Sequence, residues 1–278
     1  MPRTWLVTGS SRGFGREIVE AALKRGDRVL ATARNPDQLD DLAAYGDAVV
    51  SFALDVTDSA GTRRAVDAAI SSFGSLDVVV NNAGYAASAA IEEMSEESFR
   101  DQIETNLFGV VNVTMATLPI FHQQRSGHFL QFSSIGGRVG GSPGLGAYQT
   151  AKFAVEGFSE VLNAEVKPLG IKVTIVEPGG FRTDWGGSSM QTSPVGADYE
   201  DTVGTMNRFR ESTVSTWRGD PKRAAKILVD LVDLDEPPLR LLLGEGAVTS
   251  ADRSSRERAA EAERWAAVSR SADFPEGE

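Results

Sequence analysis

The sequence has no cysteine and only two histidines among its 278 residues. The absence of cysteine excludes disulfide bonds, thiolate metal sites and thiol nucleophiles together. So few ligands argue against a transition-metal centre, and we expect no metal site. No apolar run is long enough to cross a bilayer, and the apolar segment that begins near Trp5 leaves no room for a signal peptide. This predicts a cytoplasmic protein without membrane attachment.

The sequence also has fewer basic than acidic residues. The chain has 28 lysines and arginines against 39 aspartates and glutamates, which gives a formal net charge of −11. Binding to a nucleic-acid backbone requires a basic face, so nucleic acid is not an expected partner. Hydrophobic residues make up 41% and charged residues 24% of the chain, as in ordinary globular proteins.

Seven short apolar runs alternate with longer segments of helical period. They lie at residues 5–7, 28–32, 49–54, 76–80, 128–132, 171–176 and 239–243. The alternation predicts the α/β class, with a Rossmann-type, doubly wound parallel sheet of seven strands and helices on both faces. We expect one domain at 1–250, followed by a polar helix and tail at 251–278. Residues 179–218 are too long for an ordinary connection, which predicts an insertion that forms a substrate loop.

A glycine-rich loop follows the first apolar run directly. Its candidate dinucleotide-binding residues are Gly9, Ser11, Arg12, Gly13, Phe14 and Gly15. Glycines permit a tight turn and a close approach of the backbone to a pyrophosphate, and the following helix supplies N–H donors at its N-terminus. The spacing is G-x-x-x-G-x-G and not the commoner G-x-G-x-x-G, so the loop alone leaves a purely structural turn open.

The second apolar run is followed by Ala33 and Arg34, where an NAD-binding chain usually carries an acid. Arg34 and Arg12 are candidates for binding a 2′-phosphate through charge-assisted hydrogen bonds, which favours NADP(H) over NAD(H) as the cofactor. Asp37 comes too late to replace the missing acid and belongs to the first turn of a helix. The alternative for Arg34 is a solvated surface charge.

Four further motifs follow in chain order. They are Asn81-Asn82-Ala83-Gly84, Ser133-Ser134, Tyr148-Gln149-Thr150-Ala151-Lys152 and Pro178-Gly179. With the glycine loop, they make the chain resemble the short-chain dehydrogenase/reductase family, in its shorter single-domain branch, over about residues 4–245. The resemblance implies an oxidoreductase that moves a hydride between nicotinamide and a ketone or secondary alcohol, and a homodimer or homotetramer.

The resemblance also implies roles for single residues: Tyr148 as acid/base, Lys152 as its electrostatic partner, Ser134 as hydrogen-bond donor to the substrate oxygen, and Asn106 as fourth catalytic residue. Ser134 lies 14 positions before Tyr148, one more than the commonest family spacing. This predicts an extra residue in the loop from Gly136 to Ser142 and leaves Ser133 as an alternative. Beyond the glycine loop and Arg34, the implied cofactor-binding residues are Asp55, Val56, Asn81, Ala83, Gly84, Tyr148, Lys152, Pro178, Gly179, Phe181 and Thr183.

Residue chemistry supports the pairing of Tyr148 with Lys152. Residues four apart lie on one helix face. An unperturbed tyrosine has a pKa of roughly 10, and a nearby ammonium group lowers it toward neutrality. An isolated tyrosine and lysine at this spacing are usually only a surface helix pair, so the inference depends on the accompanying motifs.

Two competing interpretations exist. Residues 140–144 satisfy the G-x-S-x-G nucleophile motif of α/β-hydrolases with Ser142, but that fold needs its histidine after the serine. His122 and His128 both precede Ser142, and we interpret them as surface or helix-end residues. The second alternative is a non-catalytic NADP-binding regulator on the same sheet, which would not be expected to keep all four implied catalytic residues.

The expected substrate is a small carbonyl compound or alcohol. The insertion contains seven large, mostly apolar side chains: Phe181, Trp185, Met190, Tyr199, Met206, Phe209 and Trp217. They either line an apolar substrate pocket under a lid or pack helices against the sheet. On the first hypothesis, Trp185 and Phe209 line the pocket.

Overall fold

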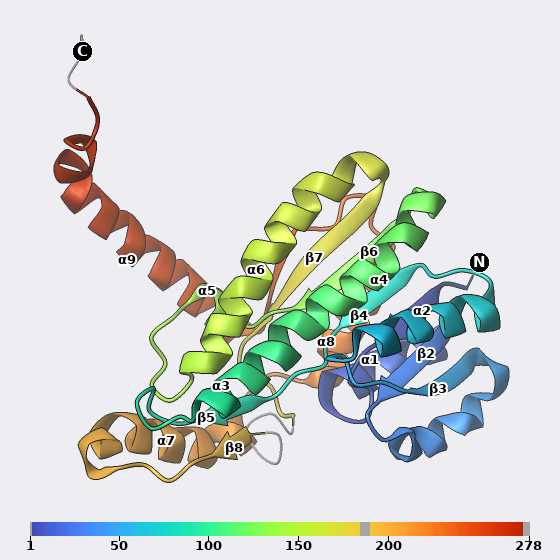
Figure 1. Ribbon diagram of the computed structural model, residues 1–278, viewed down its shortest axis with the longest axis horizontal. Coiled ribbons are helices and arrows are strands. Elements are labelled where there is room, and N and C mark those ends of the chain that lie inside the picture. The colour runs from blue at the N-terminus through green and yellow to red at the C-terminus, as the bar shows by residue number, and fades with distance from the viewer. Residues whose placement is uncertain (1, 184–189, 275–278) are drawn as a thin grey trace.

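The computed structural model describes residues 2–183 and 190–274. Its main element is a seven-stranded sheet of order β3-β2-β1-β4-β6-β7-β9, in which all neighbouring strands are parallel (Figure 1). The strands are β1 (Thr4–Val7), β2 (Arg28–Ala33), β3 (Val49–Ala53), β4 (Val78–Asn81), β6 (Gly127–Phe132), β7 (Ile171–Pro178) and β9 (Arg240–Leu243). Each of the seven predicted apolar runs is a strand of this sheet, so the predicted fold is confirmed.

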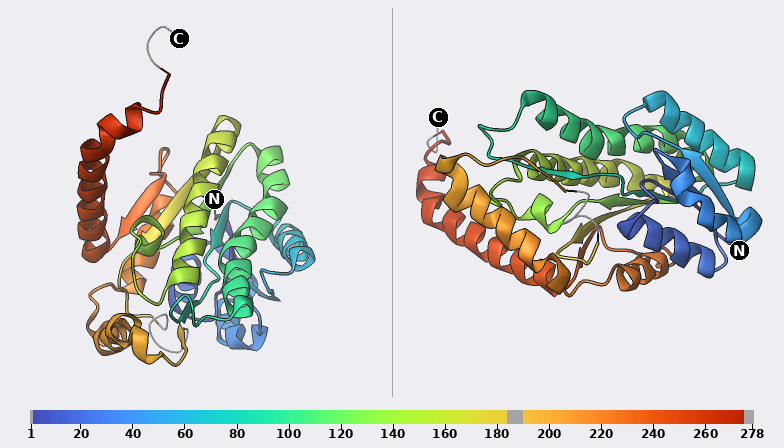
Figure 2. Two further views of the ribbon diagram at one scale, coloured as in Figure 1. Left: turned by 60° about the vertical axis from the view of Figure 1, so that its left-hand side comes forward. Right: turned by 90° about the horizontal axis from the view of Figure 1, so that it is seen from below.

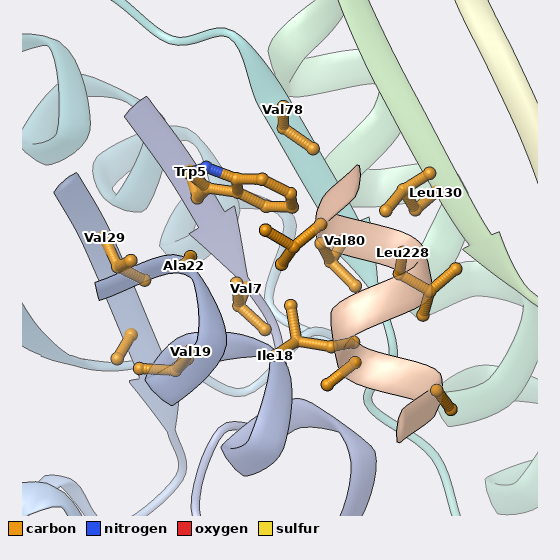
Figure 3. Packing of buried hydrophobic residues seen from close by; sticks show 14 of the residues in the cluster. Trp5, Val7, Ile18, Val19, Ala22, Val29, Val78, Val80, Leu130 and Leu228 are labelled. Carbon is orange, nitrogen blue, oxygen red and sulfur yellow. The ribbon is translucent and has the colours of Figure 1, made fainter. Parts of the chain in front are cut away.

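Helices bury both faces of the sheet (Figure 2). One face is covered by α1 (Gly13–Lys24) and α8 (Pro221–Leu231), and the other by α2 (Ser59–Phe73), α4 (Gly109–Gln124) and α6 (Gly146–Val166). Val7 of β1 packs against Ile18 and Leu228 on the first face (Figure 3), whereas Leu6 packs on the second. Because both faces are covered, successive strand residues are apolar without a polar alternation.

The site is positioned by the order of the strands. From β1 the chain runs outward through β2 and β3, and it then returns to β4 on the other side of β1. In open α/β sheets, ligands bind outside the carboxyl ends of the strands at such a switch point. Asn82, directly after β4, donates from Nδ2 to the Thr8 carbonyl at 3.0 Å, which joins the loops that follow β1 and β4.

The insertion forms a small layer of its own beside these strand ends. Its described part contains β8 (Met190–Thr192) and α7 (Thr205–Thr213), together with short helical turns. β8 pairs with β5 (Ala86–Ser88) in a second, two-stranded parallel sheet, and Ser88 donates to the Asn207 side chain at 2.7 Å. The sequence patterns did not predict this second sheet, which ties the insertion to the segment after β4.

The described residues contain three further α-helices, α3 (Glu96–Ile103), α5 (Ile135–Arg138) and α9 (Glu245–Arg270). α9 projects from the body of the protein, and only Ala247 and Ala251 are buried in it (Figure 1). The predicted C-terminal polar helix is therefore present, but it begins at Glu245 and not after residue 250. Within the described residues, no helix is both long and apolar enough to span a membrane.

One histidine differs from its predicted position. His122 lies exposed in the last turn of α4, as expected for a helix-end residue. His128 is instead buried in β6, with Nε2 at 3.0 Å from the Thr174 hydroxyl, and burial lowers its pKa to about 3. The surface prediction was wrong for His128 because a central strand buries residues of either polarity.

Candidate active site

A cavity of about 810 Å³ lies at the carboxyl ends of the strands. Loops after the strands, the N-terminal part of α6 and part of α7 form its walls. All the predicted site residues line this cavity except Gly15, Asn81 and Asn106. The structure therefore brings motifs from the whole length of the sheet to a single site.

The glycine loop provides a cradle of backbone atoms. Gly9 and Gly13 have φ values of +68° and +57°, a region that favours glycine. The N-cap residue of α1 is Arg12, whose side chain has no acceptor atom for the N–H groups of the first turn. Gly13 and Phe14 of that turn line the cavity. A dinucleotide pyrophosphate fits this arrangement of N–H donors and absent side chains.

Gly15 does not line the cavity but packs closely against the glycine loop. A Cβ atom at Gly15 would lie 2.2 Å from the Gly9 carbonyl oxygen and 2.6 Å from Nδ2 of Asn82. A larger residue would therefore push the glycine loop away from α1. The structure therefore shows close packing of Gly15 beneath the loop, and its place in cofactor binding stays a prediction.

The residues predicted to determine the preference for NADP or NAD line the cavity. Arg12, Ala33 and Arg34 all line it, as do Asp55 and Val56 after β3. Arg34 is exposed and forms no ion pair with another described residue. Asp37 does not line the cavity, because it lies in the helical turn that the Asn35 side chain caps. No carboxylate follows β2 at this point.

Tyr148, Lys152 and Ser134 all line the cavity. α6 presents the first two on one face, and the Lys152 Nζ lies 5.8 Å from the centre of the Tyr148 ring. Ser134 follows β6 and is half-buried, and its Oγ accepts a hydrogen bond from the Gly136 N–H at 3.0 Å. These three side chains are placed together from two separate elements.

Lys152 is an almost fully buried cation, with 5% of its surface exposed. Its Nζ donates to the Phe132 carbonyl at 2.7 Å, and no carboxylate of the described residues lies within 4.0 Å of it. Burial lowers the pKa of Lys152 to about 8. The group therefore remains protonated at neutral pH, where its charge favours the phenolate form of a nearby tyrosine.

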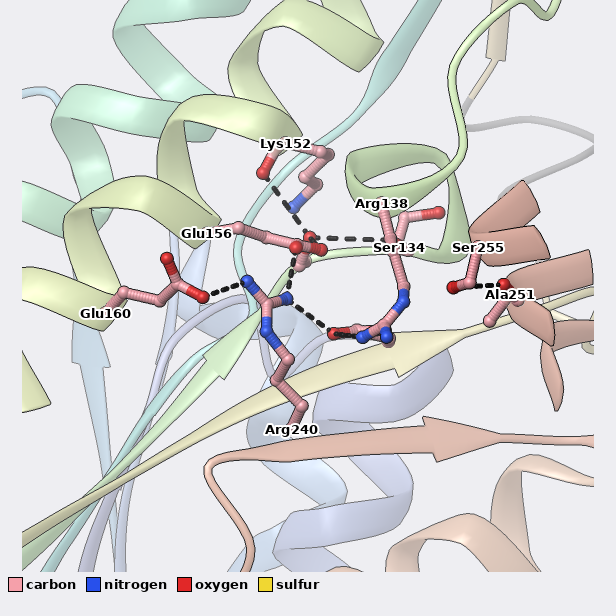
Figure 4. Close-up of polar contacts among 10 residues, drawn as sticks. Ser134, Arg138, Lys152, Glu156, Glu160, Arg240, Ala251 and Ser255 are labelled. Atoms are coloured by element: carbon pink, nitrogen blue, oxygen red, sulfur yellow. Dashed lines mark hydrogen bonds and ion pairs between the residues drawn. The ribbon is translucent and has the colours of Figure 1, made fainter. Parts of the chain in front are cut away.

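The neighbouring serine, Ser133, also lines the cavity, and its hydroxyl is bonded to a cluster of charged side chains, of which Glu156, Glu160 and Arg240 are labelled in Figure 4. Its Oγ donates to Glu156 at 2.8 Å, and Glu156 pairs with Arg240. Arg240 also contacts Glu160 and Glu177, each at 2.7 Å. Burial raises the pKa of Glu156, against the opposing effect of its bonds from Arg240 and Ser133. With Ser133 held by this cluster, the geometry favours Ser134 as the serine that contacts a substrate.

Two predicted asparagines lie behind the wall. Asn81 is buried and donates from Nδ2 to Thr114 and Gln131 at 3.2 and 2.8 Å, so the prediction that it reaches a ribose is corrected. Side chains alternate along a strand, and Asn82 is the residue that lines the cavity. Asn106 is fully buried and bonds both the N–H and the carbonyl of Tyr85, at 3.0 and 2.8 Å.

The insertion contributes only some of its large side chains. Phe181, Met206 and Trp217 line the cavity, and Met190 packs against Tyr148 and Leu145. Phe209 is 58% exposed and does not line it, so the prediction for Phe209 was wrong. Trp185 lies outside the described residues.

Sequence reasoning missed other lining residues. Tyr85 also lines the cavity, and its position directly after the Asn-Asn-Ala-Gly motif could have indicated this. Arg210 on α7 lines the cavity too, but no motif near it indicated a place in the site.

Comparison with known proteins identifies the class of this site. Residues 3–193 match the sequence profile of the family described as short chain dehydrogenase. The chain belongs to this family and is an oxidoreductase with a nucleotide-binding Rossmann fold. It is 48% identical to oxidoreductase BOA17 of Botryotinia fuckeliana over 271 residues, which cover 97% of this chain and 98% of the relative.

Solved structures show the same fold. A short-chain dehydrogenase from Streptomyces avermitilis superposes with a TM-score of 0.92 and 40% identity, covering 99% of this chain and 100% of that chain. An alcohol dehydrogenase from Thermococcus sibiricus, complexed with 5-hydroxy-NADP, gives a TM-score of 0.72 and 26% identity over 87% of this chain and 96% of that chain. Other solved structures of this fold contain NAD or NADP.

Proposed function

We propose that this chain is an NADPH-dependent oxidoreductase that transfers a hydride between nicotinamide and a ketone or secondary alcohol. The observation that carries the proposal is the position of Tyr148, buried beside Lys152 in the same cavity as the glycine loop. We infer that residues 1–250 act as one catalytic unit, with 179–218 on the substrate side and 251–278 as an appended helix and tail.

The cofactor would be held mainly by backbone atoms and two arginines. Gly9, Gly13 and the first turn of α1 suit a pyrophosphate. Arg12 and Arg34 suit a 2′-phosphate, which favours NADP over NAD. Further along the cavity, Asp55 and Val56 would contact the adenine end. At the nicotinamide end, the proposed contacts are Pro178, Gly179, Phe181 and Thr183.

The side chains of the site would handle the proton. The bound dinucleotide supplies the hydride. In the reducing direction, Tyr148 donates its phenolic proton to the carbonyl oxygen, and Ser134 donates a hydrogen bond to the same oxygen. The Lys152 ammonium stabilises the phenolate that remains on Tyr148, because an opposite charge favours the ionised form. Asn106 would act as a positioning residue that fixes the backbone of Tyr85 at the cavity wall.

A screen of neutral ketones, aldehydes and keto acids with NADPH tests the proposal, with the loss of NADPH absorbance as the readout. The alternative, a non-catalytic NADP-binding regulator, predicts NADPH binding without turnover of any compound. Turnover of several carbonyls with NADPH, and weaker turnover with NADH, is the expected result.

We also propose that the chain forms a homodimer or homotetramer. Large apolar side chains are exposed on α4 and α6, among them Met115 and Val161. A contiguous apolar patch on a protein surface often marks an interface between chains. Sedimentation analysis of the purified protein measures the state directly, and a monomer at micromolar concentration would contradict the proposal.

A further inference from the structure

Arg210 is a buried arginine in the wall of the cavity. It lies on α7 within the insertion, and 6% of its surface is exposed. Its Nη1 donates to the Asn207 side chain at 3.0 Å, and its Nη2 donates to the Ser142 hydroxyl and the Pro143 carbonyl, both at 2.7 Å. All three acceptors are uncharged.

Arg210 has no negative partner among the described residues, since none of their carboxylates lies within 4.0 Å of it. Arg240, a half-buried arginine near the site, has three. Burial lowers the pKa of Arg210 to about 10, so the group is still a cation at neutral pH. Burying a charge without a partner is costly, and the chain has an excess of acids from which a partner could have been drawn. Among the described residues, Arg210 therefore lacks a counter-charge, which an anion that enters with a ligand would supply.

The geometry of the guanidinium group defines which anion fits. An arginine has five N–H donors in a planar fork, and three bonds are made to described residues. Two N–H groups remain, the Nε–H and one on Nη1, and because they point to different sides of the group each can donate one separate bond to a ligand. A singly charged group such as a carboxylate balances the single positive charge.

Apolar side chains that share the cavity with this cation and Tyr148 suggest the rest of the ligand. Leu145 and Met206 line the same cavity as Arg210 and Tyr148. A ligand that reaches both groups would therefore lay a hydrocarbon segment against these side chains.

The position of Arg210 relative to Tyr148 is held by α6. Gln149, next to Tyr148, accepts from the Ser142 N–H and donates to the Val139 carbonyl, both at 3.1 Å. The loop that receives Arg210 is thus fastened to the helix that carries Tyr148. This is the loop in which the spacing before Tyr148 predicts an extra residue.

We propose that Arg210 binds a carboxylate of the substrate, so that the enzyme reduces carbonyl compounds that carry a carboxylate at the far end of an apolar segment. This inference rests on the proposed function of Tyr148. The competing role for Arg210 is that of a latch, which only fastens α7 to the loop at Ser142 and Pro143.

The test compares levulinate and its next two longer homologues with their methyl esters, which differ only in the charge. For wild type, we expect at least one acid to exceed its ester about tenfold or more in kcat/KM with NADPH. In Arg210→Gln, the KM for that acid should rise by about tenfold or more while the ester changes less than about threefold. Arg210→Lys should recover part of the preference, because it restores the positive charge with a different arrangement of donors.

Arg208→Gln is the matched control, because Arg208 is exposed on the same helix and pairs with Glu200. It should leave the ratio of acid to ester unchanged. A thermal melt of each variant checks folding. Equal losses for acid and ester in Arg210→Gln, or a wild type without preference for any acid, would overturn the assignment in favour of the latch.

Calorimetric titration of the NADP⁺-bound protein with the same acids needs no turnover and separates the two hypotheses. Acid binding that Arg210→Gln abolishes, in a protein that reduces no carbonyl, would contradict the proposed function but support Arg210 as a carboxylate site. Reduction of neutral ketones without binding of any acid would support the proposed function and overturn the role of Arg210.

Discussion

The two halves of the cavity are built in different ways. The cofactor half consists of short loops at the ends of β1, β2, β3 and β4, with glycine backbone as a principal wall. The substrate half consists of side chains from the insertion and from the loop before α6, and its contacts join distant positions such as Arg210 and Ser142. Backbone recognition needs fixed local spacing, whereas side-chain recognition across long distances does not. The first half can therefore be recognised from local motifs, and the second depends on the assembled fold.

The largest expected effect lies where the two halves meet. Tyr148→Phe removes the proton donor and keeps the ring, so kcat should fall by about a thousandfold while the Kd for NADPH changes little. Steady-state kinetics and fluorescence titration measure the two quantities. Tyr85→Phe is the matched control, since Tyr85 lines the same cavity, and it should keep most of the turnover. Near-normal turnover of Tyr148→Phe would refute the mechanism.

Lys152 should affect both cofactor binding and turnover. It should also determine how kcat/KM declines at high pH. Its pKa of about 8 means that its charge is present below this pH and is lost as the pH rises through it. Because the ammonium stabilises the phenolate product, kcat/KM for reduction should be level below pH 8 and decline above it. Lys152→Ala should lower turnover by about a hundredfold, weaken NADPH binding and remove this decline.

The exposed Lys167 gives a control for that experiment, and Lys167→Ala should retain the wild-type profile. A decline near pH 8 that persists in Lys152→Ala would assign the decline to another group. Unchanged NADPH binding in Lys152→Ala would restrict the lysine to its electrostatic action on Tyr148.

A change confined to the cofactor half should alter the choice of cofactor alone. Arg34→Ala should weaken NADPH binding by about tenfold or more and leave NADH binding nearly unchanged, because NADH lacks the 2′-phosphate. Adding Ala33→Asp should complete the reversal, since a carboxylate repels the phosphate and accepts bonds from ribose hydroxyls. The measurement is the dissociation constant of each cofactor for wild type and both variants. If wild type already binds NADH more tightly than NADPH, Arg12 and Arg34 are surface charges and do not bind a 2′-phosphate.

The smallest expected effect tests which side chains of α7 contact the substrate. Met206 and Phe209 lie on the same helix, but only Met206 lines the cavity. Met206→Ala should change the KM for an apolar ketone by about tenfold or less, with the NADPH Kd unchanged. Phe209→Ala should alter neither. A substrate effect of Phe209→Ala equal to that of Met206→Ala would mean that α7 closes differently during turnover, and thermal melts of both variants exclude a general loss of folding.

Particular residues show why prediction succeeded in one place and failed in another. The strands were predictable because buried parallel strands are continuous apolar runs, and Gly9 and Gly13 because their φ values exclude most other residues. Asn81 was assigned to the wrong side because a motif names residue types and does not say which of two adjacent asparagines faces the cavity. Arg210 carried no signal, because its acceptors in the loop at Ser142 are 68 positions away.

The same reason explains the errors at His128 and Phe209. His128 is polar but buried, because it lies in a strand that is covered on both faces. Phe209 is aromatic but exposed, because it lies on a face of α7 that points to solvent. The Glu156, Glu177 and Arg240 cluster likewise joins residues up to 84 positions apart. Local patterns predict local structure and backbone sites, whereas the partners of charged side chains depend on the assembled fold.

The outer turns of α9 give the protein a natural point of attachment. Beyond Arg258, which lies over the Phe153 ring at 6.0 Å, the side chains of α9 are exposed with the exception of the half-buried Ala266. A fluorescent label or a fused domain placed on these turns would stand away from the sheet, the cavity and the insertion. Tethering the enzyme to a solid support through α9 should therefore preserve its catalytic properties.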